Sequence, residues 1–262
     1  AMMEPVTKYA VEVHEPDTLS ETIANAYRVA KSGKRGASFV SIPQDVTDSL
    51  VSVKAIKPLT DPQLGSASVG DINYLAQAIR NADLPVLLLG NGASTRAVTK
   101  SIRKLLEAVK LPVVETFQGA GIVSRELEED TFFGRVGLFR NQPGDMLLKK
   151  ADLVIAIGYD PIEYEARNWN AEISARIIVI DVAQAEIDTY FQPERELIGN
   201  IADTIDLLLP AVNGYVLTKA SVDYLQNLKK NVVEDVKFDR NSKEGLVHPL
   251  DVIDVLQENT TD

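Results

Sequence analysis

A series of short, continuous runs of valine, isoleucine and leucine, separated by segments of helical periodicity, constrains the fold of this chain most. The runs occupy residues 86–89, 113–115, 153–157 and 177–181. Helices are predicted around them, at about residues 71–82, 95–109, 145–150 and 201–209. Strands that are apolar along their whole length are typical of a parallel sheet covered by helices on both faces. The pattern predicts an α/β domain with a doubly wound parallel sheet.

The first segment of the chain is predicted to be incomplete. Residues 1–50 predict a helix over about 20–32, capped by Thr18 or Ser20 and ended by Gly33, and one strand over 37–42. One helix and one strand cannot bury their apolar faces alone. This segment is therefore either the edge of the next domain or the end of a domain whose beginning is absent.

Residues 51–70 show neither the alternation of a strand nor the periodicity of a helix, and they contain scattered proline and glycine. This predicts a linker between domains. Beyond residue 212 the chain becomes polar, with helices predicted near 219–234 and from Pro249. We expect this last segment to be the beginning of a further domain that is cut short. Ala1 before Met2 is an unusual start for a natural chain and suggests a residue left by a cleaved tag.

Composition excludes several kinds of partner and site. The net charge of -11 and the pI of about 4.8 disfavour binding to nucleic acid or to an anionic membrane. The sequence has no cysteine, which excludes disulfides and thiolate chemistry and is typical of a reducing compartment. No apolar run approaches the roughly 20 residues that span a bilayer. We expect a cytoplasmic protein.

A small-residue turn follows the first buried run. Gly90, Asn91, Gly92 and Ala93 lie between this strand and a predicted helix, where glycines let a backbone approach a phosphate and the helix N-terminus favours the anion. Asp181, at the end of a later strand, is the candidate for binding a ribose hydroxyl. The full G-x-G-x-x-G pattern is absent, because threonine stands at its last position. A purely structural turn is the favoured alternative.

The sequence predicts no metal site. His14 and His248 stand in no metal-ligand spacing and beside no serine nucleophile. The acidic run at residues 126–130 is typical of a solvated surface rather than of a cation site.

Four stretches resemble one enzyme family. They are TKYAVEV at residues 7–13, FVSIPQDV at 39–46, GRVGLFRNQ at 134–142 and IGYDPIEY at 157–164. The first two are similar to the end of the first domain of the thiamine-diphosphate-dependent acetolactate synthases, just before their linker. The last two resemble the catabolic, FAD-independent branch in particular. The resemblance covers nearly the whole chain and centres on the middle domain of these enzymes.

The resemblance implies a Rossmann-like central domain over residues 71–212. It places the end of the pyrimidine-binding domain at 1–50, a linker at 51–70, and a linker with the start of the diphosphate-binding domain at 213–262. It implies an intact parent enzyme that condenses two pyruvate molecules to 2-acetolactate and CO2 through a thiamine-bound hydroxyethyl intermediate. Thiamine diphosphate and Mg2+ are the cofactors implied for that parent, and FAD is not expected.

Within this chain the resemblance implies no catalytic residue, and no cofactor is expected to bind. The activating glutamate of the first domain and the Gly-Asp-Gly motif of the third are expected outside it, so the chain alone is predicted to be inactive. The turn at 90–93, with Asp181, is interpreted as a vestigial nucleotide site. Gln118, Phe139, Arg140 and Asn141 are the candidates nearest the substrate entrance. Arg140 is a candidate for attracting the pyruvate carboxylate, with an ordinary surface arginine as the alternative.

The implied partners are the missing N- and C-terminal domains and further copies of the enzyme in a homo-oligomer, a dimer or a tetramer. Three alternatives stay open. The chain is the central domain of another thiamine enzyme, such as an oxo-acid decarboxylase, a pyruvate oxidase or a carboligase; or it is a nucleotide-binding module; or it is a purely structural domain.

Overall fold

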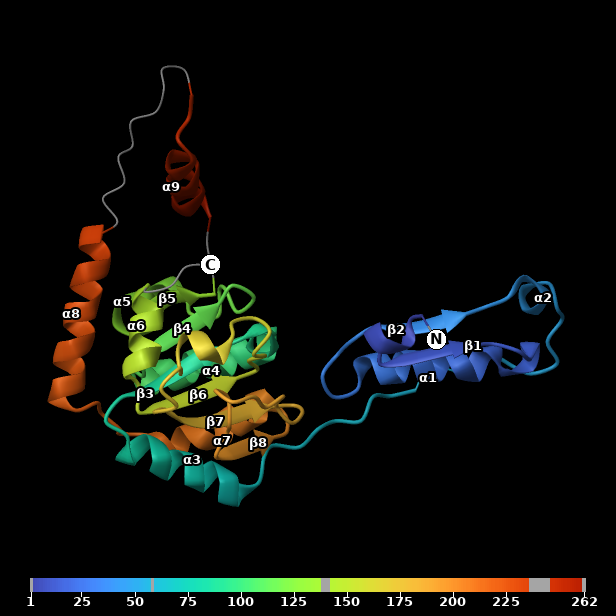
Figure 1. The fold of residues 1–262 in the computed structure, drawn as a ribbon, viewed down its shortest axis with the longest axis horizontal. Helices are drawn as coiled ribbons and strands as arrows, with labels where there is room; N and C mark the ends of the chain where they lie inside the picture. Colours follow the sequence, from blue (N-terminus) through green and yellow to red (C-terminus); the bar gives the residue numbers. More distant parts are fainter. Residues whose placement is uncertain (1, 58, 138–141, 236–245, 261–262) are drawn as a thin grey trace. The chain divides into compact units, whose positions relative to one another are not determined.

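The computed structural model describes residues 2–57, 59–137, 142–235 and 246–260, with the backbone alone described for 231–235. The chain divides into two compact units, Ala1–Leu64 and Gly65–Asp262. The first unit, blue in Figure 1, contains a sheet of two strands, and the second contains a sheet of six.

The first unit is a β-α-β segment with a parallel sheet. Strand β1 (Tyr9–Glu12) pairs with β2 (Ser38–Ser41), and α1 (Leu19–Lys31) connects them. The single-turn helices η1 (Glu4–Val6) and η2 (Pro16–Thr18) precede β1 and α1, and α2 (Gln44–Thr47) follows β2. Strand β1 is absent from the sequence prediction, because four residues ending in an acid carry no clear strand pattern.

The ends of α1 differ in how well the sequence predicts them. Gly33 lies just beyond the helix with a φ of 53°, the left-handed exit that glycine adopts without strain. The predicted side-chain cap is wrong, because the hydroxyl of Thr18 donates to the carbonyl of Glu15 at 2.8 Å. The hydroxyl of Ser20 instead accepts from the N–H of Ile56 at 2.7 Å and fixes the segment that follows α2.

Six parallel strands form the sheet of the second unit, in the order β5-β4-β3-β6-β7-β8. The strands are β3 (Pro85–Leu89), β4 (Val113–Thr116), β5 (Phe132–Val136), β6 (Leu153–Ile157), β7 (Arg176–Asp181) and β8 (Arg195–Ile198). The chain starts at the centre, moves to one edge, returns beside β3 and moves to the other edge, so β5 and β8 are the two edges in Figure 1. This order is that of doubly wound dinucleotide-binding folds. The predicted fold class is confirmed.

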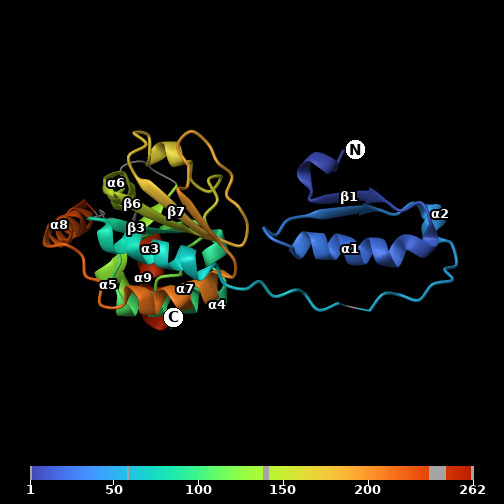
Figure 2. The same cartoon turned by 90° about the horizontal axis from the view of Figure 1, so that it is seen from below.

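Helices cover both faces of this sheet. They are α3 (Val69–Asn81), α4 (Arg96–Ala108), α5 (Arg125–Thr131), α6 (Pro143–Lys150), α7 (Ile201–Val212) and α8 (Lys219–Asp235), with the short η3 (Asn91–Ala93) and η4 (Ala166–Asn168). The last helix, α9 (Pro249–Asn259), buries none of its residues. Alternate strand residues belong to different cores: Leu87 and Leu89 pack with α3, α4 and α7, and Val86 and Leu88 pack with α6 and α8. Figure 2 shows α4 and α7 on one side of the strands and α6 on the other. Burial on both faces explains the continuous apolar runs.

Two segments that flank the sheet are fixed to it by hydrogen bonds. The N–H of Asn200 donates to the carbonyl of Gly65 at 2.8 Å, and the N–H of Ala67 donates to the hydroxyl of Thr204 at 3.0 Å. Helix α8 packs through Leu225 and Leu228, both buried. The end of the predicted linker, from Gly65 on, and the helix after residue 212 therefore belong to the second unit.

Helix α7 extends beyond its predicted end. The sequence predicts an end near residue 209 because proline interrupts helical hydrogen bonding. The helix instead continues through Pro210 to Val212, whose side chain is fully buried in the core. Burial of this last turn outweighs the one hydrogen bond that the proline removes.

Strand β5 contains a β-bulge where it pairs with β4. Val113 of β4 lies opposite Phe132, but Glu115 lies opposite Arg135, so β5 uses one residue more than β4 over the same stretch. Gly134, at φ 99°, lies within this β-bulge. Strand β5 and helix α5 are both missing from the sequence prediction, as is the edge strand β8.

Candidate functional site

The carboxyl ends of β3 and β6 meet where the strand order reverses, the place where ligands bind in open α/β sheets. The turn after β3 packs directly against the turn after β6. A Cβ added to Gly158 would lie 2.4 Å from the nitrogen of Ala93, and one added to Gly90 would lie 2.5 Å from the Cα of Tyr159. These glycines are needed because the two backbones leave no room for a side chain.

Every backbone N–H from Gly90 to Ser94 donates a hydrogen bond within the chain. The N–H of Asn91 donates to both carboxylate oxygens of Glu163, at 3.1 and 3.0 Å. The other four bonds run from Gly90 to Ile157 (3.1 Å), Gly92 to Gly158 (2.8 Å), Ala93 to Gly90 (3.0 Å) and Ser94 to Asn91 (3.1 Å). Helix α4 begins later, at Arg96. As they stand, these residues do not fit a dinucleotide pyrophosphate, because no N–H of the turn is left to bind one.

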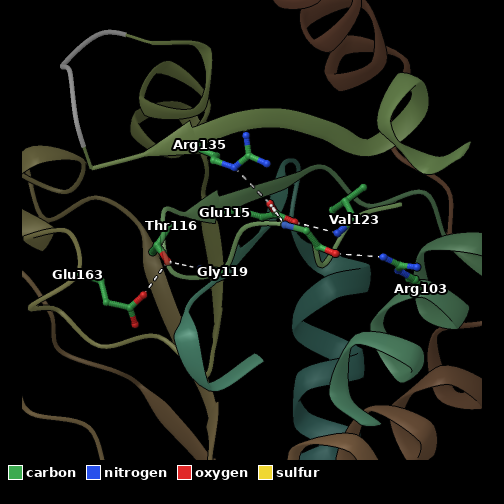
Figure 3. Close-up of polar contacts among 8 residues, drawn as sticks. Arg103, Glu115, Thr116, Gly119, Val123, Arg135 and Glu163 are labelled. Carbon is green, nitrogen blue, oxygen red and sulfur yellow. Dashed lines mark hydrogen bonds and ion pairs between the residues drawn. The ribbon is translucent and has the colours of Figure 1, made fainter. Parts of the chain in front are cut away.

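The carboxylate of Glu163 is an anion held by a backbone N–H of the turn after β3. Besides Asn91, its carboxylate accepts from the N–H of Asp160 at 3.1 Å and from the hydroxyl of Thr116 at 2.6 Å. Figure 3 shows the bond from Thr116 at the end of β4. One carboxylate therefore joins the ends of β3, β4 and β6.

A second carboxylate lies on the other side of β4. Glu115 is only 1% exposed, and it accepts from the N–H of Val123 at 2.8 Å and of Gly121 at 3.3 Å. Arg135 lies across from it, with 3.9 Å between its Nε and the carboxylate (Figure 3). Burial raises the pKa of the Glu115 carboxyl, and the donated N–H of Val123 and the charge of Arg135 oppose that shift.

The predicted site residues lie in different parts of the structure, and not all of them are among the described residues. Gln118 is exposed on the loop between β4 and α5. Asp181 lies at the end of β7, with β6 between it and β3, and one of its oxygens accepts from the N–H of Val182 at 2.6 Å. The other candidates, Phe139, Arg140 and Asn141, lie outside the described residues.

Three aromatic side chains pack together beside the turn after β6. Tyr159 and Trp169 are both buried and meet the ring of Phe191 edge to face, with centroid distances of 5.4 and 6.4 Å. The hydroxyl of Tyr159 donates to the carbonyl of Tyr164, and burial raises its pKa. These aromatic residues serve core packing here.

The described residues contain no group of three or more histidine, cysteine, aspartate or glutamate side chains that would suit a metal ion. Helix α5 carries the acidic run at residues 126–130, and its four acids are exposed, as the sequence predicts for a solvated surface. Over the part of the chain that the structure describes, no helix is both long and apolar enough to cross a membrane.

Sequence reasoning misses Glu115, Thr116 and Glu163 as site residues. The available signal is an acid in an otherwise apolar buried strand, VVET, because a carboxylate is buried only when it is bonded. Glu163 carries no comparable signal, since two of its three partners lie 47 and 72 residues away.

Comparison with known proteins agrees with this architecture. Residues 72–208, which run from α3 into α7, match the family described as "Thiamine pyrophosphate enzyme, central domain". The chain is 41% identical over 262 residues to "Acetolactate synthase" of Bacillus subtilis and 38% identical over 261 residues to "Acetolactate synthase, catabolic" of Raoultella terrigena. It is 26% identical over 211 residues to "Acetolactate synthase isozyme 1 large subunit" of Escherichia coli.

These matches cover 100%, 98% and 79% of this chain, but only 46%, 46% and 37% of the respective relatives. The chain thus spans about half the length of the curated relatives it matches. Because the family match covers more than half of the chain and coincides with the six-stranded unit, the chain belongs to the thiamine pyrophosphate enzymes and carries their central domain.

Proposed function

We propose that this chain is the central part of an acetolactate synthase of the catabolic type. The similarity that extends over the whole chain carries this proposal: identity is 41% and 38% to two acetolactate synthases at nearly full coverage, one of them named catabolic. It falls to 26% at 79% coverage for the isozyme 1 large subunit.

The proposed reaction joins two pyruvate anions and one proton to give 2-acetolactate and CO2. Thiamine diphosphate, held with Mg2+ by the intact enzyme, would accept the electron pair left by decarboxylation. The described residues of this chain offer neither a metal site nor a diphosphate site at the turn after β3. We therefore assign to this chain a scaffolding and orienting role, and propose that it has no synthase activity alone.

We further propose that the enzyme needs no FAD. The carboxylate of Glu163 supports this, because a dinucleotide pyrophosphate would have to displace it from the N–H of Asn91 against charge repulsion. The bonds that occupy the neighbouring N–H groups support it as well.

We propose that the rest of the enzyme consists of an N-terminal and a C-terminal domain, and that the enzyme is a cytoplasmic homo-oligomer. The exposed apolar residues of the first unit, among them Tyr27, Leu50 and Leu59, support a missing covering surface. The lack of cysteine is consistent with the cytoplasm.

The test is an assay of the longer polypeptide that contains this sequence. With thiamine diphosphate, Mg2+ and pyruvate, and with no FAD, it is expected to release CO2 and 2-acetolactate in equal amounts. CO2 accompanied by acetaldehyde would instead indicate a decarboxylase, and a requirement for FAD would contradict the proposed branch. Calorimetry of the 262-residue chain is expected to show no saturable heat with FAD, or with thiamine diphosphate and Mg2+.

A further inference from the structure

The loop between β4 and α5 is held at its far end by two oppositely charged side chains. Glu115 accepts the N–H groups of Gly121 and Val123. Arg103, from α4, donates to the carbonyls of the same segment, with 2.8 Å from its Nε to Ile122 O and 3.0 Å from its Nη2 to Gly121 O. The backbone at residues 121–123 is therefore bonded from both sides, as Figure 3 shows.

The same loop is also fixed where it begins. The N–H of Gly119 donates to the carbonyl and to the hydroxyl of Thr116, each at 3.1 Å. The hydroxyl of Thr116 in turn donates to Glu163. A Cβ on Gly119 would lie 2.6 Å from the carbonyl oxygen of Leu89, so the loop passes in direct contact with the end of β3.

The loop alternates between exposed and buried residues, and Ala120 and Gly121 are among the exposed ones. Gly119, Ile122 and Val123 are buried, whereas Phe117 and Gln118 are exposed. Gln118 is thus exposed on a loop that is bonded to the sheet on either side of it. Such a position suits a binding residue, because little conformational freedom is lost when it meets its ligand.

The position of Glu115 is difficult to explain by stability alone. A carboxylate that is 1% exposed and 3.9 Å from its nearest cation is costly to bury, and an apolar residue would suit the strand better. What the carboxylate supplies that an apolar residue cannot is a pair of acceptors for the loop N–H groups.

We propose that Glu115 is a positioning residue that holds the Gln118 loop in place for substrate, with Arg103 as its counterpart on the carbonyl side. The role towards substrate rests on the proposed function, because Gln118 is placed near the pyruvate entrance by family resemblance. The hold on the loop rests on the hydrogen bonds alone.

Hydrogen exchange of the 262-residue chain tests the hold on the loop. Replacing Glu115 by alanine is expected to accelerate exchange at the amides of Gly121 and Val123 by about tenfold or more, the equivalent of one lost hydrogen bond. Exchange in Glu115→Gln, which keeps one acceptor oxygen, is expected to be faster than in wild type and slower than in Glu115→Ala. Amides of β6 should be unaffected, and Glu107→Gln, an exposed glutamate on α4, is the matched control.

Arg103→Ala provides a second route to the same result if Glu115→Ala does not fold. It removes the bonds to the carbonyls and is expected to accelerate exchange over the same residues. Unchanged exchange at residues 121–123 in the variants that fold would overturn the proposal.

Kinetics of the longer polypeptide test the role towards substrate. Glu115→Gln and Gln118→Ala are each expected to raise the KM for pyruvate by about tenfold with kcat within about twofold, and the double variant should add little to either. A normal KM in Glu115→Gln, despite faster loop exchange, would overturn the positioning role and leave the proposed function intact. A wild-type enzyme that forms no acetolactate would overturn the proposed function and the substrate role together, whereas the exchange result would stand.

Discussion

Removing the Glu163 carboxylate should destabilise the second unit more than the loss of any exposed acid. The carboxylate accepts from Asn91, Asp160 and Thr116, and these donors come from three different parts of the sheet edge. In Glu163→Ala all three donors lose their acceptor, and the side chains around them leave only partial access for water, since Glu163 is half-buried.

The magnitude follows from those three bonds. Hydrogen bonds to a charged acceptor contribute about 1.5–3 kcal/mol each, but partial access of water and non-additivity reduce the sum. We expect Glu163→Ala to lower the free energy of unfolding by about 2–4 kcal/mol and Glu163→Gln by about 1 kcal/mol, because the amide keeps one acceptor oxygen. For a unit of this size, 3 kcal/mol corresponds to a fall in Tm of about 6–12 °C.

Urea unfolding followed by the fluorescence of Trp169 measures this effect. Trp169 is the only tryptophan in the sequence and is 2% exposed, so it reports on the second unit alone. Glu165→Ala is the matched control, since its exposed carboxylate pairs with Arg167 at 3.3 Å and such pairs contribute about 0–1 kcal/mol. A Glu163→Ala variant within about 0.5 kcal/mol of this control, at equal m-values, would refute the reasoning.

Three further outcomes are expected. Gly158→Ala should lower the free energy of unfolding by about 3 kcal/mol or prevent folding, because residue 158 has a φ of 54° and its new Cβ would clash with Ala93. Gly214→Ala, at a φ of 76° but in open space, should cost about 1–2 kcal/mol in the same urea assay. Equal losses in the two variants would contradict the packing argument. The free energy of unfolding of wild type, relative to Glu115→Gln, should increase as pH falls. The pKa of Glu115 is raised above 4.5 in the folded state, which therefore binds the proton more tightly than the unfolded state, so stability falls as pH rises through the raised value. Urea titrations at several pH values measure this dependence, and the opposite slope would refute the reasoning. Trypsin should cut first at the exposed Lys54, outside regular secondary structure, and leave Trp169 fluorescence unchanged, whereas Lys57 is protected by the proline that follows it. Mass spectrometry that finds first cuts between β3 and β8 would contradict this.

The sequence predicts the central strands well because burial on both faces leaves one pattern only. Strand β6 has the predicted bounds, Leu153–Ile157, and all five of its residues are buried. Edge strands lack this constraint: β8 reads RELI, with its arginine exposed, and is no different in composition from a surface loop. Local sequence therefore identifies the middle of the sheet and loses its edges.

The candidate site is predicted in place but not in chemistry. The turn at Gly90 lies at the reversal of strand order, where a ligand site is expected. What fills it depends on Glu163, which lies three strands further along the chain than the turn. The charge at this turn and the hydrogen bonding of its backbone N–H groups depend on tertiary structure, so no local sequence motif predicts them.

The bulge at Gly134 sets which residue of β5 meets the buried acid of β4. In a regular strand, residues an odd number apart point to opposite faces, yet Phe133 and Val136 belong to the same core, because the extra residue between them inverts the alternation. The cation at Arg135 is thereby brought to the side of Glu115. A change of one residue in the length of β5 would separate the pair even with both side chains kept, so a relative shorter by one residue here is expected to lack the buried glutamate or to supply its cation from elsewhere.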